Sequence, residues 1–238
     1  MKAVILAAGK GKRLKPLTDE KHKVMLPIGN RPMLEYTIET LSKNGIKEIF
    51  IVINQRKEDI MDHFKDGSDF SVSIKYLNQK NPKGTADAVR YAEDNIDESF
   101  ILLNGDVFFH PSILESLLEE SKNADGVIVA KEVSNPEHYG SLQIEDGKIT
   151  KIIEKSQNPP SNIVNQGLYY LPRDIFEAIE ETPLSERGEY ELTDSLEILI
   201  KKGLVIRPLI VKDFCIDIGR MEDYEKAKEA FSQWKNER

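Results

Sequence analysis

The sequence predicts an α/β protein built on a mainly parallel β-sheet. Short apolar runs that fit buried strands alternate with segments whose apolar residues recur at helical spacing, as in repeated βα units. Polar turns that contain glycine follow two of these strand-like runs, at residues 9–11 and 104–106. Because ligands bind at the carboxyl ends of the strands in such sheets, the two turns also mark the expected site.

The alternation is clearest over the first 135 residues. Pro32 begins the first long helix and Gly45 follows it, while Pro111 begins a later one; proline and glycine favour these two ends of a helix. Strands are expected at residues 2–8, 48–54, 72–77, 100–109 and 126–133. Helices are expected at residues 32–45, 58–64, 84–96 and 112–120.

The pattern becomes looser after about residue 135. Asp146-Gly147 lies between two alternating segments and predicts a hairpin over residues 141–155. A strand over residues 162–171 ends at Pro172, and helices resume near Arg173. The remaining expected elements are a helix at 191–203, strands at 205–211 and 214–219, and a helix at 222–235. No sharp boundary divides the chain, so we expect one domain whose second part extends the same sheet.

Composition excludes several classes of protein. The chain has 238 residues, of which 39% are hydrophobic, so it can bury a substantial core. No apolar run approaches the roughly 20 residues that span a bilayer, and the run at residues 3–8 is too short for a signal peptide. We therefore expect a cytoplasmic protein with no membrane partner. Cys215 is the only cysteine, and the four histidines show no ligand spacing, so a disulfide and a zinc site are not expected.

Charge is distributed unevenly along the chain. Residues 1–31 contain eight basic and two acidic side chains and carry net +6, so the remaining residues carry −14. An acidic protein is a poor partner for a nucleic acid, but one basic pocket suffices for a small phosphorylated molecule. The alternative is that these lysines lie on a solvated loop.

The glycine-rich turn fits neither of the two common phosphate-binding motifs. Leu14 occupies the third glycine position of a dinucleotide fingerprint, and no glycine stands where a P-loop requires one. Gly9 and Gly11 still allow the backbone to approach phosphate oxygens closely. Lys12 and Arg13 would supply positive charge, and Arg13 could bind a phosphate through two hydrogen bonds.

Residues 6–18, with Lys23 ahead of Leu26-Pro27, resemble the signature of the sugar-phosphate nucleotidylyltransferases, or nucleotide-sugar pyrophosphorylases. Gln79 and residues 84–88 are similar to the base-recognition segment of that family. Further segments resemble its sugar and metal segments, in family order: residues 104–106, 139–140, 154–155, 165–169, 188–194, 217–219 and 222–224.

The resemblance implies a Rossmann-like three-layer nucleotide-diphospho-sugar transferase fold with a mixed, mainly parallel central sheet. It implies a single nucleotidylyltransferase domain over residues 1–238, in which about 1–135 bind the nucleotide and about 136–238 form the sugar-binding part and the C-terminal helices. The likeness is to the glucose-1-phosphate thymidylyl- and uridylyltransferases. Longer relatives continue into a left-handed β-helix, so a second activity is not expected of this chain.

The implied reaction is attack by a sugar 1-phosphate on the α-phosphorus of a nucleoside triphosphate, which gives a nucleotide sugar and pyrophosphate. Arg13, Lys23 and Asp106 are the expected catalytic residues, with Mg²⁺ held by Asp106 and Asp217. The expected nucleotide contacts are Leu6, Ala8, Gly9, Gly11, Lys12, Arg13, Gln79, Gly84 and Thr85. The expected sugar-phosphate contacts are Gly140, Glu154, Lys155 and Asn165.

Several alternatives remain open at this point. The amide of Gln79 suits the imide edge of uracil or thymine, which favours UTP or dTTP with glucose or N-acetylglucosamine 1-phosphate. The alternatives are a mannose-1-phosphate guanylyltransferase and a non-catalytic regulatory protein that binds nucleotide sugars. Transfer to phosphocholine is disfavoured because the sugar segments are present. A homo-oligomer is possible.

Overall fold

The computed structural model describes residues 1–9, 11–54 and 57–236; Lys10, one of the basic residues of the opening segment, lies outside them. Four parallel strands form one half of the central sheet in the order β6-β1-β4-β5. They are β1 (Ala3–Ala7), β4 (Glu48–Ile53), β5 (Ser73–Asn78) and β6 (Phe100–Asn104). In register, Ile5 of β1 lies between Ile51 of β4 and Leu103 of β6.

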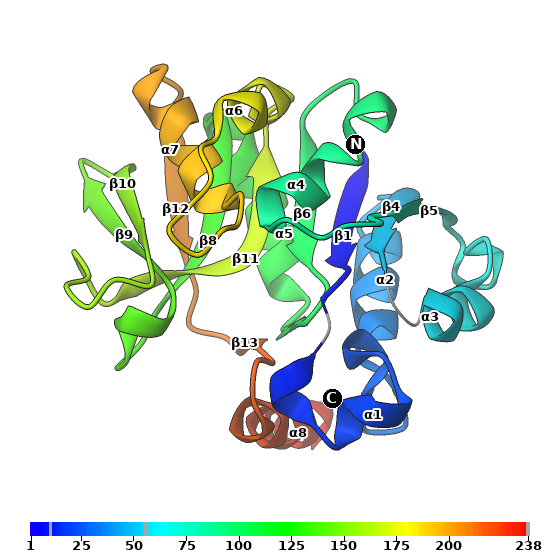
Figure 1. Ribbon diagram of the computed structural model, residues 1–238. Helices are drawn as coiled ribbons and strands as arrows, with labels where there is room; N and C mark the ends of the chain where they lie inside the picture. The colour runs from blue at the N-terminus through cyan, green and yellow to red at the C-terminus, as the bar shows by residue number, and fades with distance from the viewer. Residues whose placement is uncertain (10, 55–56, 237–238) are drawn as a thin grey trace.

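The second half of the chain extends this sheet in a mixed orientation (Figure 1). Its strands are β8 (Gly126–Glu132), β9 (Gly140–Glu145), β10 (Lys148–Glu154), β11 (Ile163–Leu171) and β12 (Ile206–Ile210). The long strand β11 pairs antiparallel with β6, β8 and β9, and β12 pairs parallel with β8. Within the described residues the sheet therefore has nine strands, and both halves of the chain contribute to it.

Helices cover both faces of the sheet and make it the middle of three layers (Figure 1). Alternate strand residues face opposite sides, so Ala3, Ile5 and Ala7 join one core and Val4 the other. The first core packs against α2 (Met33–Lys43), α3 (Lys57–Phe64), α5 (Ser112–Glu120) and α8 (Met221–Asn236). The second packs against α4 (Thr85–Arg90), α6 (Ile175–Glu181) and α7 (Leu192–Lys201).

Two expected elements differ from the structure. The helix predicted over residues 84–96 is shorter in the structure, where α4 ends at Arg90 and a short 3-10 helix follows at Glu93–Asn95. The stretch at 93–95 contains aspartate and asparagine, whose side chains compete with the helix for backbone hydrogen bonds. The predicted strand over 100–109 breaks at Gly105, whose N–H donates to the Leu6 carbonyl over 2.9 Å. The chain continues as β7 (Val107–Phe109), which pairs with β13 (Cys215–Asp217) in a separate small sheet.

The segment after β1 consists of short elements packed against the C-terminal helix. These are a 3-10 helix at Lys12–Leu14, α1 (Leu17–Glu20), a 3-10 helix at Lys23–Met25, β2 (Pro27–Ile28) and β3 (Arg31–Pro32). The Tyr224 hydroxyl on α8 donates to the Pro27 carbonyl over 2.6 Å. Figure 1 shows α1 and α8 next to each other, so the segment that follows β1 and the C-terminal helix meet below the sheet.

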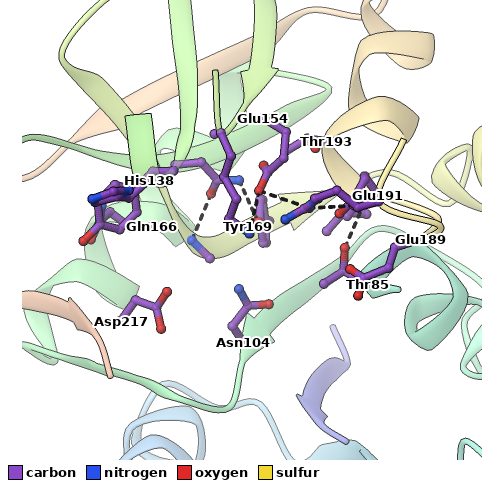
Figure 2. A pocket seen from close by; sticks show the side chains of 17 residues that line it. Thr85, Asn104, His138, Glu154, Gln166, Tyr169, Glu189, Glu191, Thr193 and Asp217 are labelled. Carbon is purple, nitrogen blue, oxygen red and sulfur yellow. Dashed lines mark hydrogen bonds and ion pairs between the residues drawn. The ribbon is translucent and has the colours of Figure 1, made fainter. Parts of the chain in front are cut away.

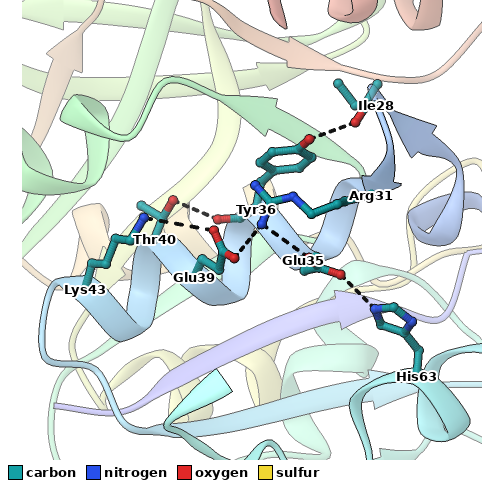
Figure 3. Close-up of polar contacts among 8 residues, drawn as sticks. All are labelled: Ile28, Arg31, Glu35, Tyr36, Glu39, Thr40, Lys43 and His63. Atoms are coloured by element: carbon teal, nitrogen blue, oxygen red, sulfur yellow. Dashed lines mark hydrogen bonds and ion pairs between the residues drawn. The ribbon is translucent and has the colours of Figure 1, made fainter. Parts of the chain in front are cut away.

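Polar contacts fasten the same segment to α2 and α3 (Figure 3). The Arg31 guanidinium lies 4.3 Å from the centre of the Tyr36 ring and bonds Glu39 over 2.5 Å and Glu35 over 3.3 Å. His63 of α3 lies 2.8 Å from the other oxygen of Glu35. None of the described helices combines the length and the apolar composition that a membrane crossing requires.

Candidate functional site

Three hollows meet at Asp217, and two of them border the carboxyl end of β6. The strand-end pocket is lined by Leu6, Ala8, Gly9, Gln79, Pro82, Gly84, Thr85, Ala88, Asn104, Asp106, Glu189 and Asp217. The β11 pocket lies beside it and shares Thr85, Asn104, Glu189 and Asp217 with it. The mixed-charge groove lies beyond β13; its basic residues are Arg13, Lys155, Arg220 and Lys226, and its acidic residues are Glu132, Asp217, Glu222 and Asp223. Asp217 lines all three hollows.

Six of the residues expected to bind a nucleotide line the strand-end pocket: Leu6, Ala8, Gly9, Gln79, Gly84 and Thr85. A Cβ at Gly9 would meet nothing within 4 Å, so this position leaves the backbone open to the pocket. Gly84 has φ +117°, and a Cβ there would lie 2.3 Å from the Tyr190 carbonyl. Only glycine fits position 84, because both the conformation and the space exclude a side chain.

The other residues of the glycine-rich turn have different surroundings. Gly11 has φ +60° and packs against Thr18, whose hydroxyl donates to the Gly11 carbonyl over 2.9 Å. Lys12 is exposed on the 3-10 helix and lines none of the three hollows. Arg13 lines the mixed-charge groove. The structure thus separates two basic neighbours that the sequence presents together.

Two carboxylates from distant parts of the chain come together at the β7–β13 pair. Asp217 pairs in register with Val107, and the Ile218 N–H donates to the Asp106 carbonyl over 2.9 Å. Lys23, whose side chain is only 10% exposed, forms an ion pair and hydrogen bond with Asp106. Asp223 accepts from the N–H groups of Gly219 and Arg220 and so fixes the turn after Asp217.

Burial and the nearby Asp106 charge raise the pKa of Asp217 to about 7, against the opposing influence of Lys23. A divalent cation would relieve this repulsion, and Mg²⁺ takes one or two carboxylates together with phosphate oxygens. Within the described parts of the chain, no cluster of three or more metal-ligating side chains exists. The pair therefore fits a cation that is shared with a phosphorylated substrate rather than one caged by protein alone.

The four residues expected to contact a sugar phosphate, Gly140, Glu154, Lys155 and Asn165, all line the β11 pocket. Asn165 lies at a register shift in β11. Its side-chain oxygen Oδ1 accepts from the Gly167 N–H, and its side-chain nitrogen Nδ2 donates to the Tyr169 hydroxyl. These bonds fix the orientation of its amide. Lys155 has φ +46°, unusual for a residue with a side chain, and its N–H donates to the Tyr139 carbonyl over 2.9 Å.

Figure 2 shows Glu154 and Thr193 on one side of this pocket and Asp217 and Asn104 on the other. Arg187 lies 2.6 Å from Glu191 and 3.7 Å from Glu154, and Lys155 lies 3.2 Å from Glu154. The charged side chains of the pocket thus pair with one another. The hydroxyl groups of a bound sugar can replace these ion pairs with hydrogen bonds to the same side chains.

Thr193 has a role that sequence reasoning missed. Its hydroxyl is buried in the wall of the β11 pocket and finds no hydrogen-bond partner among the described residues. Buried hydroxyls are rarely left unpaired, so this atom points to a ligand that completes it. Further polar lining residues without an expected role include Asn104, Arg187, Glu189 and Glu191. The signal for all of these except Arg187 was their place in segments 104–106 and 188–194, and Arg187 lies just before the second segment.

Backbone hydrogen bonds connect the two pockets directly. Tyr190 donates to the Lys83 carbonyl over 2.7 Å and accepts from the Ala86 N–H over 3.0 Å. The Leu192 N–H donates to the Thr85 hydroxyl over 3.0 Å. The loop before α7 and the start of α4 therefore form one unit that borders both pockets.

The mixed sheet, its two helical layers and the glycine-rich turn at the strand ends define a Rossmann-like protein of the nucleotide-diphospho-sugar transferase fold, as predicted. The chain belongs to the nucleotidyl transferase family, whose sequence profile matches residues 2–233.

Relatives of known name agree with this assignment. The bifunctional protein GlmU of Methanocaldococcus jannaschii is 40% identical over 228 residues; the match covers 95% of this chain and 53% of the relative, so the chain spans about half of that protein. The UTP–glucose-1-phosphate uridylyltransferase AglF of Haloferax volcanii is 36% identical over 237 residues, covering 98% of this chain and 97% of the relative.

Solved structures give the same result. A putative glucose-1-phosphate thymidylyltransferase from Bacillus anthracis superposes with a TM-score of 0.88 at 29% identity, over 96% of this chain and 94% of the other. A UDP-glucose pyrophosphorylase in complex with UDP-glucose superposes with a TM-score of 0.85 at 28% identity, over 98% of both chains.

Proposed function

We propose that this protein transfers a nucleotidyl group from UTP or dTTP to a hexose 1-phosphate and releases pyrophosphate. The observation that carries the proposal is the position of Asp217, where three hollows of different chemistry meet. A nucleoside, a sugar and a chain of phosphates would each occupy one hollow, and the α-phosphorus would lie at their junction. The family and the names of the relatives support this arrangement.

The nucleoside is assigned to the strand-end pocket. Its floor consists of small residues, Ala8, Gly9 and Gly84, which allow close contact with a flat ring and with phosphate oxygens. Gln79 is the buried side chain that offers an amide to the edge of a base. We assign uracil or thymine to it, because their imide edge carries both acceptors and a donor.

The sugar 1-phosphate is assigned to the β11 pocket, with glucose 1-phosphate or N-acetylglucosamine 1-phosphate as the proposed substrates. Glu154 accepts from sugar hydroxyls, and the Thr193 hydroxyl gains the partner that it lacks in the protein alone. Lys155 lines both this pocket and the mixed-charge groove, so its ammonium group would contact the sugar phosphate.

The chemistry requires no covalent intermediate. An oxygen of the sugar phosphate forms a bond to the α-phosphorus, the bond to the bridging oxygen breaks, and pyrophosphate leaves with that electron pair. Lys23 and Lys155 reduce the repulsion between the two anions, and Arg13 in the groove holds the leaving pyrophosphate. Asp106 and Asp217 would hold Mg²⁺, which supplies further charge neutralisation when bound.

The proposal is tested by measuring pyrophosphate release with Mg²⁺ over a grid of substrates. UTP, dTTP, GTP, CTP and ATP are each combined with glucose, N-acetylglucosamine, mannose and galactose 1-phosphates. Activity with UTP or dTTP and a glucose-type phosphate is expected, and Asp106→Asn should lower kcat/KM at least about 100-fold, because it removes a proposed metal ligand.

Other outcomes of the grid would replace the proposal. Strong preference for GTP with mannose 1-phosphate would make the protein a guanylyltransferase. No turnover with any pair, while nucleotide sugars still bind, would identify a non-catalytic regulatory protein.

A further inference from the structure

A buried hydrogen bond connects the end of β5 with the first turn of α4. The side-chain nitrogen Nε2 of Gln79 donates to Oδ2 of Asp87 over 2.7 Å, and both side chains are more than nine-tenths buried. The Lys83 backbone N–H lies 3.4 Å from the same oxygen, and the Arg90 guanidinium lies 3.6 Å from Oδ1. These three neighbours of Asp87 are hydrogen-bond donors, so the Asp87 oxygens face donors on this side.

This contact decides which end of the Gln79 amide faces the strand-end pocket. An amide has a donor end and an acceptor end, whereas a carboxylate only accepts, so Asp87 attracts Nε2 and excludes the carbonyl oxygen Oε1. The reversed amide would place two oxygens against each other in a buried position. No hydrogen bond among the described residues reaches Oε1, and Gln79 lines the pocket. Oε1 is thus the atom left to accept from a ligand.

We infer that Asp87 is a positioning residue that sets base selectivity by holding Gln79 as an acceptor toward N3 of a pyrimidine. The inference rests on the proposed function, in which a nucleotide occupies this pocket. Uracil and thymine carry a hydrogen on N3, whereas cytosine carries a lone pair there. The oriented amide therefore meets a donor in UTP and dTTP but another acceptor in CTP, although the rings have nearly the same size.

The test compares UTP with CTP, which differ only at the edge that the amide would read. We measure kcat/KM with glucose 1-phosphate, and equilibrium binding by calorimetry, for the wild type and for Asp87→Asn, Asp87→Ala and Arg90→Gln. The wild type should prefer UTP by about 100-fold or more, because an unpaired buried polar group in the wrong complex is costly.

Asp87→Asn should reduce this preference at least tenfold, mainly through better use of CTP. The asparagine amide can turn its own NH₂ group toward Gln79, which allows Gln79 to reverse and donate to cytosine N3. Asp87→Ala removes the acceptor that orients the Gln79 amide and should also reduce the preference for UTP. A folding defect in one of the two variants therefore does not prevent the test. Arg90→Gln removes only the half-exposed partner of Asp87 and should keep the wild-type preference.

The inference is overturned if the wild type binds CTP as well as UTP, or if both Asp87 variants keep the full preference. A merely structural role for Asp87 would lower turnover with both nucleotides equally. If the wild type turns over no nucleotide but binds UTP in preference to CTP, and the Asp87 variants lose that binding preference, the proposed function fails and the role of Asp87 stands.

Discussion

Thr193 presents a hydroxyl for which the surrounding protein provides no partner. Its isolation depends on how β11, β9 and α7 pack around it, since Gly140 and Thr193 are neighbours only in the folded chain. A Cβ at Gly140 would lie 3.2 Å from the Thr193 methyl group. The unpaired hydroxyl is therefore a feature of the fold that sequence patterns do not reveal.

Thr193→Val should raise KM for the sugar 1-phosphate about three- to tenfold, because it removes one neutral hydrogen bond to the substrate. KM for the nucleotide should not change. The free energy of unfolding should stay the same or rise slightly, because valine has the same shape and no unpaired polar atom. Steady-state kinetics with each substrate varied in turn, together with urea unfolding, measures both effects.

Thr182→Val is the matched control. The Thr182 hydroxyl is equally buried, but it donates to the Ala178 carbonyl over 2.8 Å and contacts Ser195. Its loss should destabilise the protein by about 1–2 kcal/mol and leave both KM values unchanged. Equal kinetic effects at the two positions would contradict a ligand contact at Thr193.

At the scale of elements, the sequence predicted the alternating strands and helices well. It did not predict that the strand over residues 100–109 is interrupted and forms two strands. Residues 100–109 resemble a single strand because the residues on both sides of the polar turn at 104–106 are apolar, and both parts are buried. The break depends on Gly105 lying against the Leu6 carbonyl, and the partner of β7 comes from β13 near the other end of the chain. Such long-range pairing leaves no local pattern in the sequence.

The candidate site could likewise be predicted only in part from the sequence. Asp106 and Asp217 could be anticipated from motifs at strand ends, and the structure does bring their strands together. Lys12 could not be separated from Arg13 by sequence, because the 3-10 helix that turns one away from the groove is a tertiary feature. The bond between Asp87 and Gln79 likewise left no sign in the sequence, because it depends on how α4 packs beside the end of β5.

The packing of α8 against the turn between β2 and β3 gives a prediction at this scale. A Cβ at Gly29 would lie 2.4 Å from the Phe231 ring, and Gly29 has φ +63°. Phe231 cannot easily move, because Tyr36, Phe108 and Trp234 surround its ring. Gly29→Ala should therefore destabilise the protein by about 2–4 kcal/mol, through overpacking and backbone strain together.

Gly45→Ala provides the comparison. Gly45 follows α2 with φ +79°, but a Cβ there would meet nothing within 4 Å. Only backbone strain applies, so a loss of about 1 kcal/mol is expected. Chemical denaturation of both variants separates the two contributions, and equal losses would show that Phe231 yields without cost.

At the scale of the whole molecule, the two neighbouring carboxylates of the candidate cation site lower the free energy of unfolding when no cation is bound. The pKa of Asp217 is about 7 in the folded chain, against an ordinary value of 3.8. Between these two values the folded state binds more protons than the unfolded state, so stability falls as pH rises from about 4 to 7 and levels off above that range.

Asp217→Asn should therefore be more stable than the wild type at pH 8 in the absence of divalent ions, and the difference should shrink as pH falls toward 5. Thermal unfolding in EDTA at pH 5 to 8.5 measures this. Mg²⁺ at pH 8 should raise the wild-type Tm more than that of the variant. A wild-type protein that gains stability relative to the variant between pH 5 and 8 would contradict the assignment.

The pairing of β7 with β13 also has a consequence for the newly made protein. Asp106 and Asp217 are more than a hundred residues apart, and β13, which carries Asp217, is synthesised after every strand of the central sheet. During translation, the glycine-rich turn and most of the sheet leave the ribosome before the second carboxylate exists. A chain that has been made only as far as the central sheet can bring its nucleotide-facing residues together, but the proposed cation site would form only after β13 has been added.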